Sequence, residues 1–379
     1  MMMKLLINEH NVCDYLVKSC NQPERLLSKV EPLAAKNFNL LVTFLDGEKF
    51  LVKQERHNQE GKAAGEFLGE WRIQELLLSF SSLNHLRPFF PEILHFDPDN
   101  LILVYKYLDE YHDLMDFYTT KQTFPNQVAF SIGTFLASIH GETFNCTEYE
   151  DFFFQRPGNL KINLVKDLQK ALERIEPEIF ASVPADGLKF FALYQRYDSL
   201  GQAIAELANS FTPSCLTHND FKLNNILVHQ NWEQSTESIV RLIDWERSTW
   251  GDPAFDLGTI IASYVQIWLG SLVISKSLSI DESLGLAITP LDKLQPSILI
   301  LTQAYLKKFP GILEHRPDFL KRVIQFAGFV LIQQIQAMIQ YQKSFGNTGI
   351  VMLQVAKSLL CRPEESMPTI FGLETLNIS

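Results

Sequence analysis

An α+β fold in two lobes is indicated by this amino-acid sequence: a small antiparallel sheet that carries one helix, and a larger, mostly helical lobe. β-rich runs dominate the first hundred residues, and helical periodicity dominates from about residue 110 onward, with a short β-rich interruption at residues 216–244. The chain has 379 residues, more than one hydrophobic core usually holds. We therefore expect an N-terminal lobe of residues 1–106 and a C-terminal lobe of residues 107–379.

The elements of the first lobe follow from local patterns. Residues 8–20 predict a short helix. The run NLLVTFLDGEKFLVKQ, from Asn39, holds two β-rich segments around Asp46-Gly47, and Asp-Gly between such segments is a strong hairpin signal. Residues 64–83 repeat apolar side chains at helical spacing, and the later run LILVYKY predicts another strand.

The second lobe is predicted from helical spacing. Its first amphipathic runs lie at residues 125–140, 160–176 and 188–209. His140-Gly141 predicts the end of the first run, because glycine commonly stops a helix. Everything after Phe255 has helical character, down to a polar, proline-containing tail past Arg362 that we expect to fray.

The charge balance narrows the classes of partner. The net charge is −11 and no run of clustered lysine and arginine occurs, so no nucleic-acid or anionic-membrane surface is expected. Negative charge would suit a cationic small substrate, although solubility alone is the simpler explanation. No obligate protein partner is evident from the sequence.

Cysteine and leader patterns favour a cytoplasmic protein. The five cysteines are scattered without C-x-x-C spacing, so neither a zinc site nor a disulfide framework is indicated. Glu9 and Asp14 interrupt the N-terminal apolar residues before they reach signal-peptide length. Two uncharged stretches, 257–275 and 323–342, are as long as a bilayer span, but their Gln, Ser, Thr and Gly content fits central helices of a large lobe better than membrane insertion.

One stretch, LTHNDFKLNNILV at residues 216–228, crowds polar chemistry against an apolar run. It places His218, Asp220 and Asn225 in the order H-x-D-x-x-x-x-N, and a hydrophilic loop then leads to IVRLIDWE, which contains Asp244. Two apolar strands around a hydrophilic turn predict a hairpin. Asp220 and Asn225 would then come just before its first strand and Asp244 just after its second, so the three polar groups converge at one end.

These groups suit phosphoryl transfer. That reaction needs a hydroxyl to be oriented, a hard cation to be held on the phosphates, and developing charge to be neutralised. A carboxylate can accept the hydroxyl proton, and an amide and a second carboxylate are oxygen ligands for magnesium. Each aspartate alone is as well explained by capping a turn, and His218 by core packing. The joint order, with the two aspartates 24 residues apart, favours the chemical interpretation.

With these motifs the chain resembles the aminoglycoside phosphotransferase and choline kinase superfamily, the small-molecule kinase branch of the protein-kinase-like fold. THNDFKLNNILV resembles the catalytic loop of that superfamily, and LIDWERSTWGDPAFDLG resembles its metal loop and the run that follows. Where protein kinases have D-F-G, Trp245 and Glu246 follow Asp244 here. The resemblance covers the chain from the first hairpin to about residue 260.

The resemblance implies roles for the residues of the two motifs. Asp220 would be the catalytic base that orients the acceptor hydroxyl, while Asn225 and Asp244 would bind Mg2+. His218 would brace the loop, and Lys222 would touch the transferring phosphate. Asp256 resembles a family aspartate that buttresses the catalytic loop, and a helix cap is the alternative for that residue.

The resemblance also requires a lysine and a glutamate in the first lobe. Lys53, at the end of the predicted hairpin, would hold the α- and β-phosphates of ATP. Its partner would be Glu70, with Glu75 as competitor, because five residues on a helix turn the two side chains about 140° apart and only one can face the lysine.

The strand LILVYKY would lead into a hinge that binds adenine. Backbone groups of the segment from Tyr105 through Tyr107 to Leu108 would pair with the base, and the ring would lie among Val52, Leu227 and Ile243, all equally explicable as ordinary core.

One departure from the kinase pattern is the phosphate loop. The candidate turn EPLAAKNFN, residues 31–39, has no glycine, although Ala34 and Ala35 are small and Lys36 or Asn37 are candidate substitutes.

The sequence thus indicates an ATP- and magnesium-dependent kinase that acts on a small-molecule hydroxyl. A pseudokinase that binds nucleotide without catalysis is the alternative, motivated by the glycine-free turn. A protein acceptor is less favoured, since no A-P-E segment or long activation loop follows Asp244. Residues 141–216, which include YEDFFFQR, would help to build the acceptor pocket, although a packed aromatic cluster under a loop is the simpler explanation.

Overall fold

A computed structural model describes most of the chain, namely residues 5–20, 27–33, 37–56, 65–154, 164–173, 184–234, 239–275 and 277–372. The chain forms two compact units. Unit 1 comprises Met1–His112 and Asn225–Ser248, and unit 2 comprises Asp113–Asn224 and Thr249–Ser379. Relative to the lobes expected from sequence, unit 1 also takes in the hairpin that follows the predicted catalytic loop.

Unit 1 is built on a five-stranded antiparallel sheet in the order β1-β2-β3-β5-β4. The strands are β1 (Leu27–Leu33), β2 (Phe38–Phe44), β3 (Lys49–Gln54), β4 (Ile93–Asp97) and β5 (Ile102–Lys106). The predicted hairpin joins β2 to β3, and Gly47 supplies the left-handed conformation of the turn (φ +88°). The two edge strands were not predicted, because neither alternates cleanly between buried and exposed residues.

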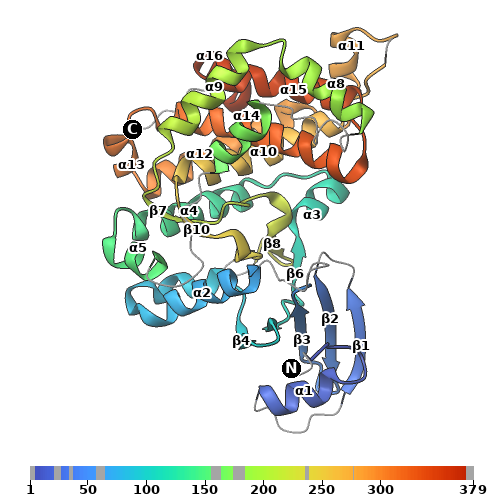
Figure 1. Cartoon of the computed structure of the whole chain (residues 1–379), viewed down its shortest axis with the longest axis vertical. Helices are drawn as coiled ribbons and strands as arrows, with labels where there is room; N and C mark the ends of the chain where they lie inside the picture. The colour runs from blue at the N-terminus through green and yellow to red at the C-terminus, as the bar shows by residue number, and fades with distance from the viewer. Residues whose placement is uncertain are drawn as a thin grey trace. The chain divides into compact units, whose positions relative to one another are not determined.

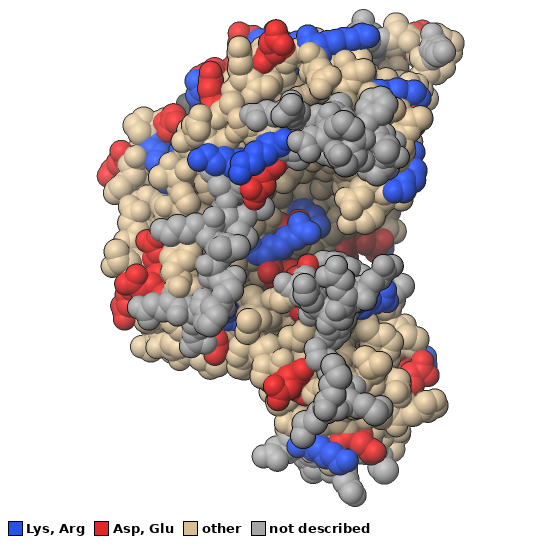
Figure 2. All heavy atoms as spheres, in the orientation of Figure 1, with Lys and Arg blue, Asp and Glu red and all other residues tan. Residues whose placement is uncertain are grey.

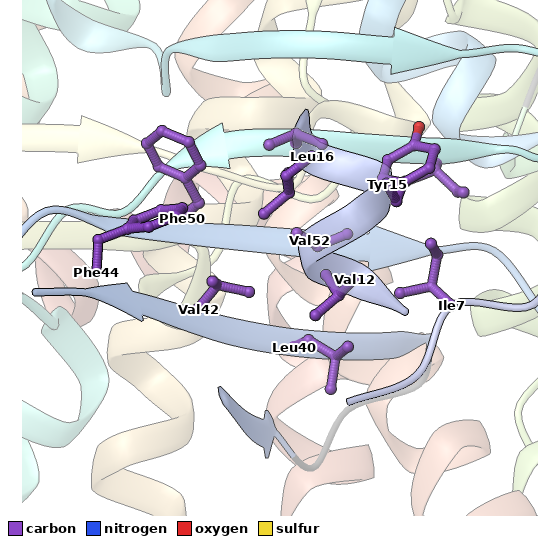
Figure 3. Close-up of a cluster of buried hydrophobic side chains, with 11 residues drawn as sticks. Ile7, Val12, Tyr15, Leu16, Leu40, Val42, Phe44, Phe50 and Val52 are labelled. Carbon is purple, nitrogen blue, oxygen red and sulfur yellow. The ribbon is translucent and has the colours of Figure 1, made fainter. Parts of the chain in front are cut away.

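Helix α1 (Val12–Ser19) covers one face of this sheet (Figure 3). Alternate residues of β2 and β3 point toward the helix, as the two-residue period of a strand requires. The cluster they form contains Ile7, Val12, Tyr15, Leu16, Leu40, Val42, Phe44, Phe50 and Val52. Helix α2 (Glu66–Ser79) packs on the opposite face through Phe67, which meets Leu103 and Tyr105. The face of β3 that carries Lys53 is therefore the α2 face.

The rest of unit 1 comprises a 3-10 helix, η1 (Ser81–Phe89), and a small sheet in the order β6-β8-β9. Its strands are β6 (Tyr111–Asp113), β8 (Ile226–His229) and β9 (Val240–Leu242), and the turn η3 (Trp245–Arg247) follows β9. The indole of Trp245 stacks on Phe90 with ring centroids 4.4 Å apart. Gly69 lets α2 approach η3 closely, since a Cβ there would lie 2.9 Å from the Glu246 carbonyl oxygen.

Unit 2 is mainly helical (Figure 1). Its helices are α3 (Leu114–Lys121), α4 (Asn126–Thr143), α5 (Thr147–Phe154), α6 (Leu164–Glu173), α8 (Ala185–Tyr194), α9 (Asp198–Ser210), α10 (Pro253–Gly270), α11 (Ile280–Gly285), α12 (Leu291–Lys308), α13 (Gly311–His315), α14 (Phe319–Ala337), α15 (Asn347–Cys361) and α16 (Pro363–Phe371). Two short strands, β7 (Cys215–Thr217) and β10 (Thr249–Gly251), pair antiparallel. In the core, α4 packs along α12, and α10 packs along α14.

Three local expectations for unit 2 were wrong. Helix α4 does not stop at His140-Gly141 but runs to Thr143, because His140 is fully buried and tied to neighbouring helices. The run at 188–209 is two helices, α8 and α9. The first part of the tail past Arg362 forms α16, whose Ile370 and Phe371 are buried, so tertiary packing orders that part; residues 373–379 lie outside the described residues.

The segment Phe319–Gln342, which includes α14, is long and apolar enough to cross a membrane. Two thirds (67%) of its most apolar window is buried inside the fold, as expected of a core helix, and no other described helix meets the same criteria. On the face drawn in Figure 2, acidic side chains are interspersed with basic ones.

Candidate functional site: an ion-pair cluster in unit 1 and a braced loop in unit 2

Lys53 lies at the centre of a charged cluster in unit 1. Its ammonium donates to Oδ1 of Asp244 at 2.8 Å and lies 5.1 Å from the ring centroid of Tyr105. The Lys53 side chain is 15% exposed. Burial disfavours its charged form, but the carboxylates of Glu70 and Asp244 outweigh that effect and raise the pKa of Lys53. The lysine therefore stays protonated and can bind an anion.

Glu70 is the glutamate that α2 brings to this lysine. It is 2% exposed, and burial raises the pKa of its carboxyl while the Lys53 charge opposes the rise. The Tyr105 hydroxyl and the Trp245 backbone N–H also lower the pKa of the Glu70 carboxyl, although neither makes a well-formed hydrogen bond with it. Glu75, the competitor from sequence, is only partly buried.

Asn225 and Asp244 lie at the same end of the β8–β9 hairpin. Ile226 pairs with Leu242, and the Ile243 N–H donates to the Asn225 carbonyl at 2.9 Å, which joins the two segments that carry the side chains. Asp244 has a left-handed backbone (φ 59°, ψ 57°), a conformation that L-residues other than Asn and Asp rarely adopt and that is common at functional sites.

The donor set of this pair fits magnesium. One amide and one carboxylate supply oxygen ligands, and Mg2+ is typically bound by one or two carboxylates together with phosphates and water. Among the described residues, no group of three or more His, Cys, Asp or Glu side chains is placed to hold a metal without such help. Asn225 and Asp244 could therefore hold Mg2+ as part of a metal–nucleotide complex.

The residues predicted to bind adenine are also in unit 1. Leu227 and Ile243 are half-buried and share one face of the hairpin, because Leu227 pairs with Arg241, two residues before Ile243. Some backbone groups of the predicted hinge segment already form hydrogen bonds within the protein. The Tyr107 N–H donates to the Lys49 carbonyl at 2.9 Å, and the Leu108 carbonyl accepts from the Tyr111 N–H at 3.2 Å.

The remaining predicted nucleotide contacts are Val52 and the phosphate loop. Val52 was wrongly placed beside adenine: it belongs to the core under α1, on the face of β3 opposite Lys53, and Leu51 is its neighbour on the lysine face. Within the predicted phosphate loop, Ala34, Ala35 and Lys36 lie outside the described residues. Asn37 is described, and its Oδ1 accepts the Arg56 N–H at 3.3 Å.

Asp256 binds the backbone of the predicted catalytic loop of unit 2. This carboxylate is fully buried and accepts the backbone N–H groups of His218 (2.7 Å) and Asn219 (2.9 Å). Asp256 therefore supports the loop, whereas the side chain that caps α10 is Asp252, which accepts the Ala254 N–H. Of the two alternatives left open for Asp256, the structure favours the buttress.

His218 and Lys222 fix the conformation around Asp220. The Asp220 N–H donates to His218 Nδ1 at 3.2 Å, so this nitrogen is the unprotonated one and His218 braces the loop. The Lys222 ammonium donates to Asp220 Oδ2 at 2.8 Å, and their side chains are 34% and 23% exposed. A carboxylate that is held by a lysine, on a braced backbone, and is still accessible to solvent is suited to meet a hydroxyl group.

Several supporting residues were missed in the sequence. His140 places Nε2 3.3 Å from Asp256 Oδ2 and Nδ1 2.9 Å from the Tyr305 hydroxyl. The Thr143 hydroxyl accepts the Leu216 N–H at 3.0 Å, just before the loop. These contacts join segments more than seventy residues apart, so no local spacing could have revealed them.

Comparisons with known proteins are consistent with this geometry. Residues 5–276, well over half of the chain, match the profile of a family described as the phosphotransferase enzyme family. A choline/ethanolamine kinase family protein from Mesorhizobium loti has a similar solved structure (14% identity, 91% of this chain and 92% of that chain, TM-score 0.51). So do amicoumacin kinase with AMP-PNP, Ca2+ and its antibiotic (16%, 97% and 96%, TM-score 0.50) and the streptomycin–ATP–APH(2")-IIa ternary complex (15%, 94% and 99%, TM-score 0.50).

At these identities the solved structures establish a shared fold, the protein-kinase-like fold of small-molecule kinases. Among curated proteins, acyl-CoA dehydrogenase family member 11 of Rattus norvegicus is 34% identical over 83 residues, which is 22% of this chain, and its Mus musculus counterpart matches equally. The match spans only 10% of the length of those relatives.

Proposed function

Because the chain belongs to the phosphotransferase enzyme family, we propose that it is a kinase that moves the γ-phosphate of ATP to a hydroxyl group of a small molecule. The observation that carries the proposal is the cluster in unit 1, where Lys53 pairs with Asp244 at 2.8 Å beside the buried Glu70. A protonated lysine next to oxygen ligands for a metal suits the binding of a metal–triphosphate.

In the proposed mechanism, Lys53 binds the α- and β-phosphates, and Asp220 orients the acceptor hydroxyl and takes up its proton. The acceptor oxygen forms a bond to the γ-phosphorus as the bond to the β–γ bridging oxygen breaks, and ADP leaves. Lys222 neutralises charge on the transferring group. Magnesium, held by Asn225 and Asp244, would supply charge neutralisation on the phosphate oxygens.

The acceptor is proposed to be a small alcohol, with an amine-bearing one favoured. The chain returns to helix at Pro253, nine residues after Asp244, which leaves little room for a segment that docks a peptide. The net charge of −11 favours a cationic compound. Similar solved proteins are named for choline or ethanolamine and for the antibiotics amicoumacin and streptomycin, so amino alcohols and aminoglycosides are the first compounds to test.

The test is ADP release from ATP and magnesium across a panel of such alcohols. Asp220→Asn should lower turnover of the accepted alcohol by about 10²- to 10⁴-fold, because it removes the proton acceptor while keeping the shape of the side chain. Asp292→Asn, an exposed position of unit 2, serves as the matched control and should leave turnover unchanged. Full turnover by Asp220→Asn, with an unchanged melting temperature, would contradict the mechanism.

A nucleotide-binding pseudokinase is the second candidate. It is favoured by the absence of glycine from EPLAAKNFN at residues 31–39, since glycine normally allows backbone N–H groups to approach phosphates. Isothermal titration separates the two candidates: a pseudokinase would bind ATP and yet release no ADP with any acceptor or with water.

A further inference from the structure

Helix α2 begins without a cap of its own. Its N-cap residue, Gly65, has a left-handed backbone (φ 81°) and offers no side chain to the first N–H groups. Those groups instead donate to Glu55, which follows β3. Oε1 of Glu55 accepts from Gly65 at 2.7 Å and Glu66 at 3.3 Å, and Oε2 accepts from Phe67 at 3.3 Å.

Glu55 is held at two points, its carboxylate by the start of α2 and its backbone by the sheet. Glu55 is 2% exposed, and its own N–H donates to the Leu101 carbonyl at 3.0 Å, beside β5 of the sheet. A buried carboxylate is costly unless it is fully hydrogen-bonded, and the N–H groups and positive dipole end of a helix are its most favourable partners. Glu55 therefore ties the end of β3 to the start of α2.

The position of this contact matters because of what the two elements carry. Lys53 lies two residues before Glu55 on the strand, and Glu70 lies three residues, less than one turn, after Phe67 on the helix. One side chain thus joins the end of β3 to the start of α2, close along the chain to both the lysine and the glutamate.

We infer that Glu55 is a positioning residue that keeps the Glu70 carboxylate in the neighbourhood of Lys53. If α2 moved, Lys53 would lose the nearby charge of Glu70 and keep those of Asp244 and Glu246, so the balance of charges around the proposed phosphate-binding lysine would change. The inference rests on the proposed kinase function, since the residue acts through the proposed phosphate-binding lysine.

The experiment is a double-mutant cycle with Glu55→Gln and Glu70→Ala, read as kcat/KM for ATP. Glu55→Gln keeps the shape of the side chain but weakens its hold on the helix, and it should lower kcat/KM by about tenfold or more, because small misplacements near reacting groups have large kinetic effects. In the Glu70→Ala background the same change should cost less than about twofold, because the group that Glu55 positions is already gone. Glu92→Gln, at an exposed glutamate of the same unit, is the matched control and should leave kcat/KM unchanged.

Hydrogen exchange at Gly65–Phe67 provides a readout independent of catalysis, and Glu55→Gln should speed it while the exchange of α10 stays unchanged. Equal losses of kcat/KM in both backgrounds would show that Glu55 acts only through general stability and would overturn the inference, as would an unchanged kcat/KM or unchanged exchange. If the wild type forms no ADP with any acceptor or water, the proposed function fails, and this inference fails with it. An active wild type with an additive cycle refutes the inference alone.

Discussion

In unit 1, the charges of Lys53 and Glu70 affect each other's pKa. Lys53 is flanked by two carboxylates, and each partner raises the pKa of the ammonium against the opposing effect of burial. Glu70 is held in the opposite balance, since burial raises the pKa of its carboxyl and the lysine charge restrains that rise. Each residue favours the charged form of the other, so substitution of either should change how stability depends on pH.

Lys53→Met should give a protein whose melting temperature falls more steeply with pH than that of the wild type. Without the lysine charge, the raised pKa of Glu70 rises further. A carboxyl whose pKa in the folded protein exceeds its ordinary value of 4.5 makes the folded state less stable as the pH rises from 4.5 through that raised pKa. The reason is that the carboxyl ionises at lower pH in the unfolded state. ADP formation should fall by about 10²-fold.

Melting curves from pH 4.5 to pH 8 check this expectation. Lys49→Met is the matched control, since Lys49 lies on the same strand and pairs with the exposed Asp109 at 2.6 Å. A Lys53→Met protein whose melting temperature tracked the wild type across the whole pH range would contradict the assigned balance of charges.

Among the helices, α10 supports the predicted catalytic loop. Asp256 in its first turn binds the loop backbone, and two residues later Gly258 packs against α14. A Cβ on Gly258 would lie 2.7 Å from both the Phe326 Cβ and the Val323 carbonyl oxygen, contacts that the backbone of α14 cannot relieve without moving.

Gly258→Ala should therefore destabilise the protein by about 1–3 kcal/mol in urea unfolding and lower ADP formation, because Asp256 moves with the helix. Gly270→Ala is the control in the same helix, where an added Cβ meets nothing within 4 Å. The control should be neutral or slightly stabilising, since alanine has less freedom to lose on folding. Equal effects of the two changes would argue against a close helix crossing at Gly258.

Elements with strong local signals were predictable, and those fixed by distant partners were not. The Asp46-Gly47 hairpin and the two polar motifs are encoded within short windows, so sequence located them. The side of β3 on which Val52 lies was misjudged because a strand pattern gives alternation but not which face meets α1. Glu55, His140 and Tyr305 carry no local mark, because their partners come from other elements.

At the scale of the whole chain, C-terminal residues support the region of the predicted catalytic loop. Asp252, at the start of α10, is fully buried and pairs with Arg316 at 2.9 Å and Arg322 at 2.8 Å. Both arginines lie beyond residue 276, where the family match ends. They also bind carbonyl groups of Thr212 and Ser210, just before β7. Residues outside the recognised family region thus hold the strand that leads into the loop.

Asp252→Asn should cost about 3–5 kcal/mol in urea unfolding, because it leaves two buried arginines without their counter-charge. The exposed substitution Asp292→Asn should change stability by less than about 0.5 kcal/mol. A loss from Asp252→Asn no larger than that of the control would mean that water reaches the arginines and that the cluster is not a closed ion network.

Unit 1 is assembled from two separate stretches of chain, Met1–His112 and Asn225–Ser248. On the ribosome, the first stretch emerges well before the second, and all of residues 113–224 are synthesised between them. The N-terminal sheet is therefore synthesised before the β8–β9 hairpin and both proposed magnesium ligands of unit 1. The proposed binding of nucleotide should thus be possible only after translation has passed Ser248.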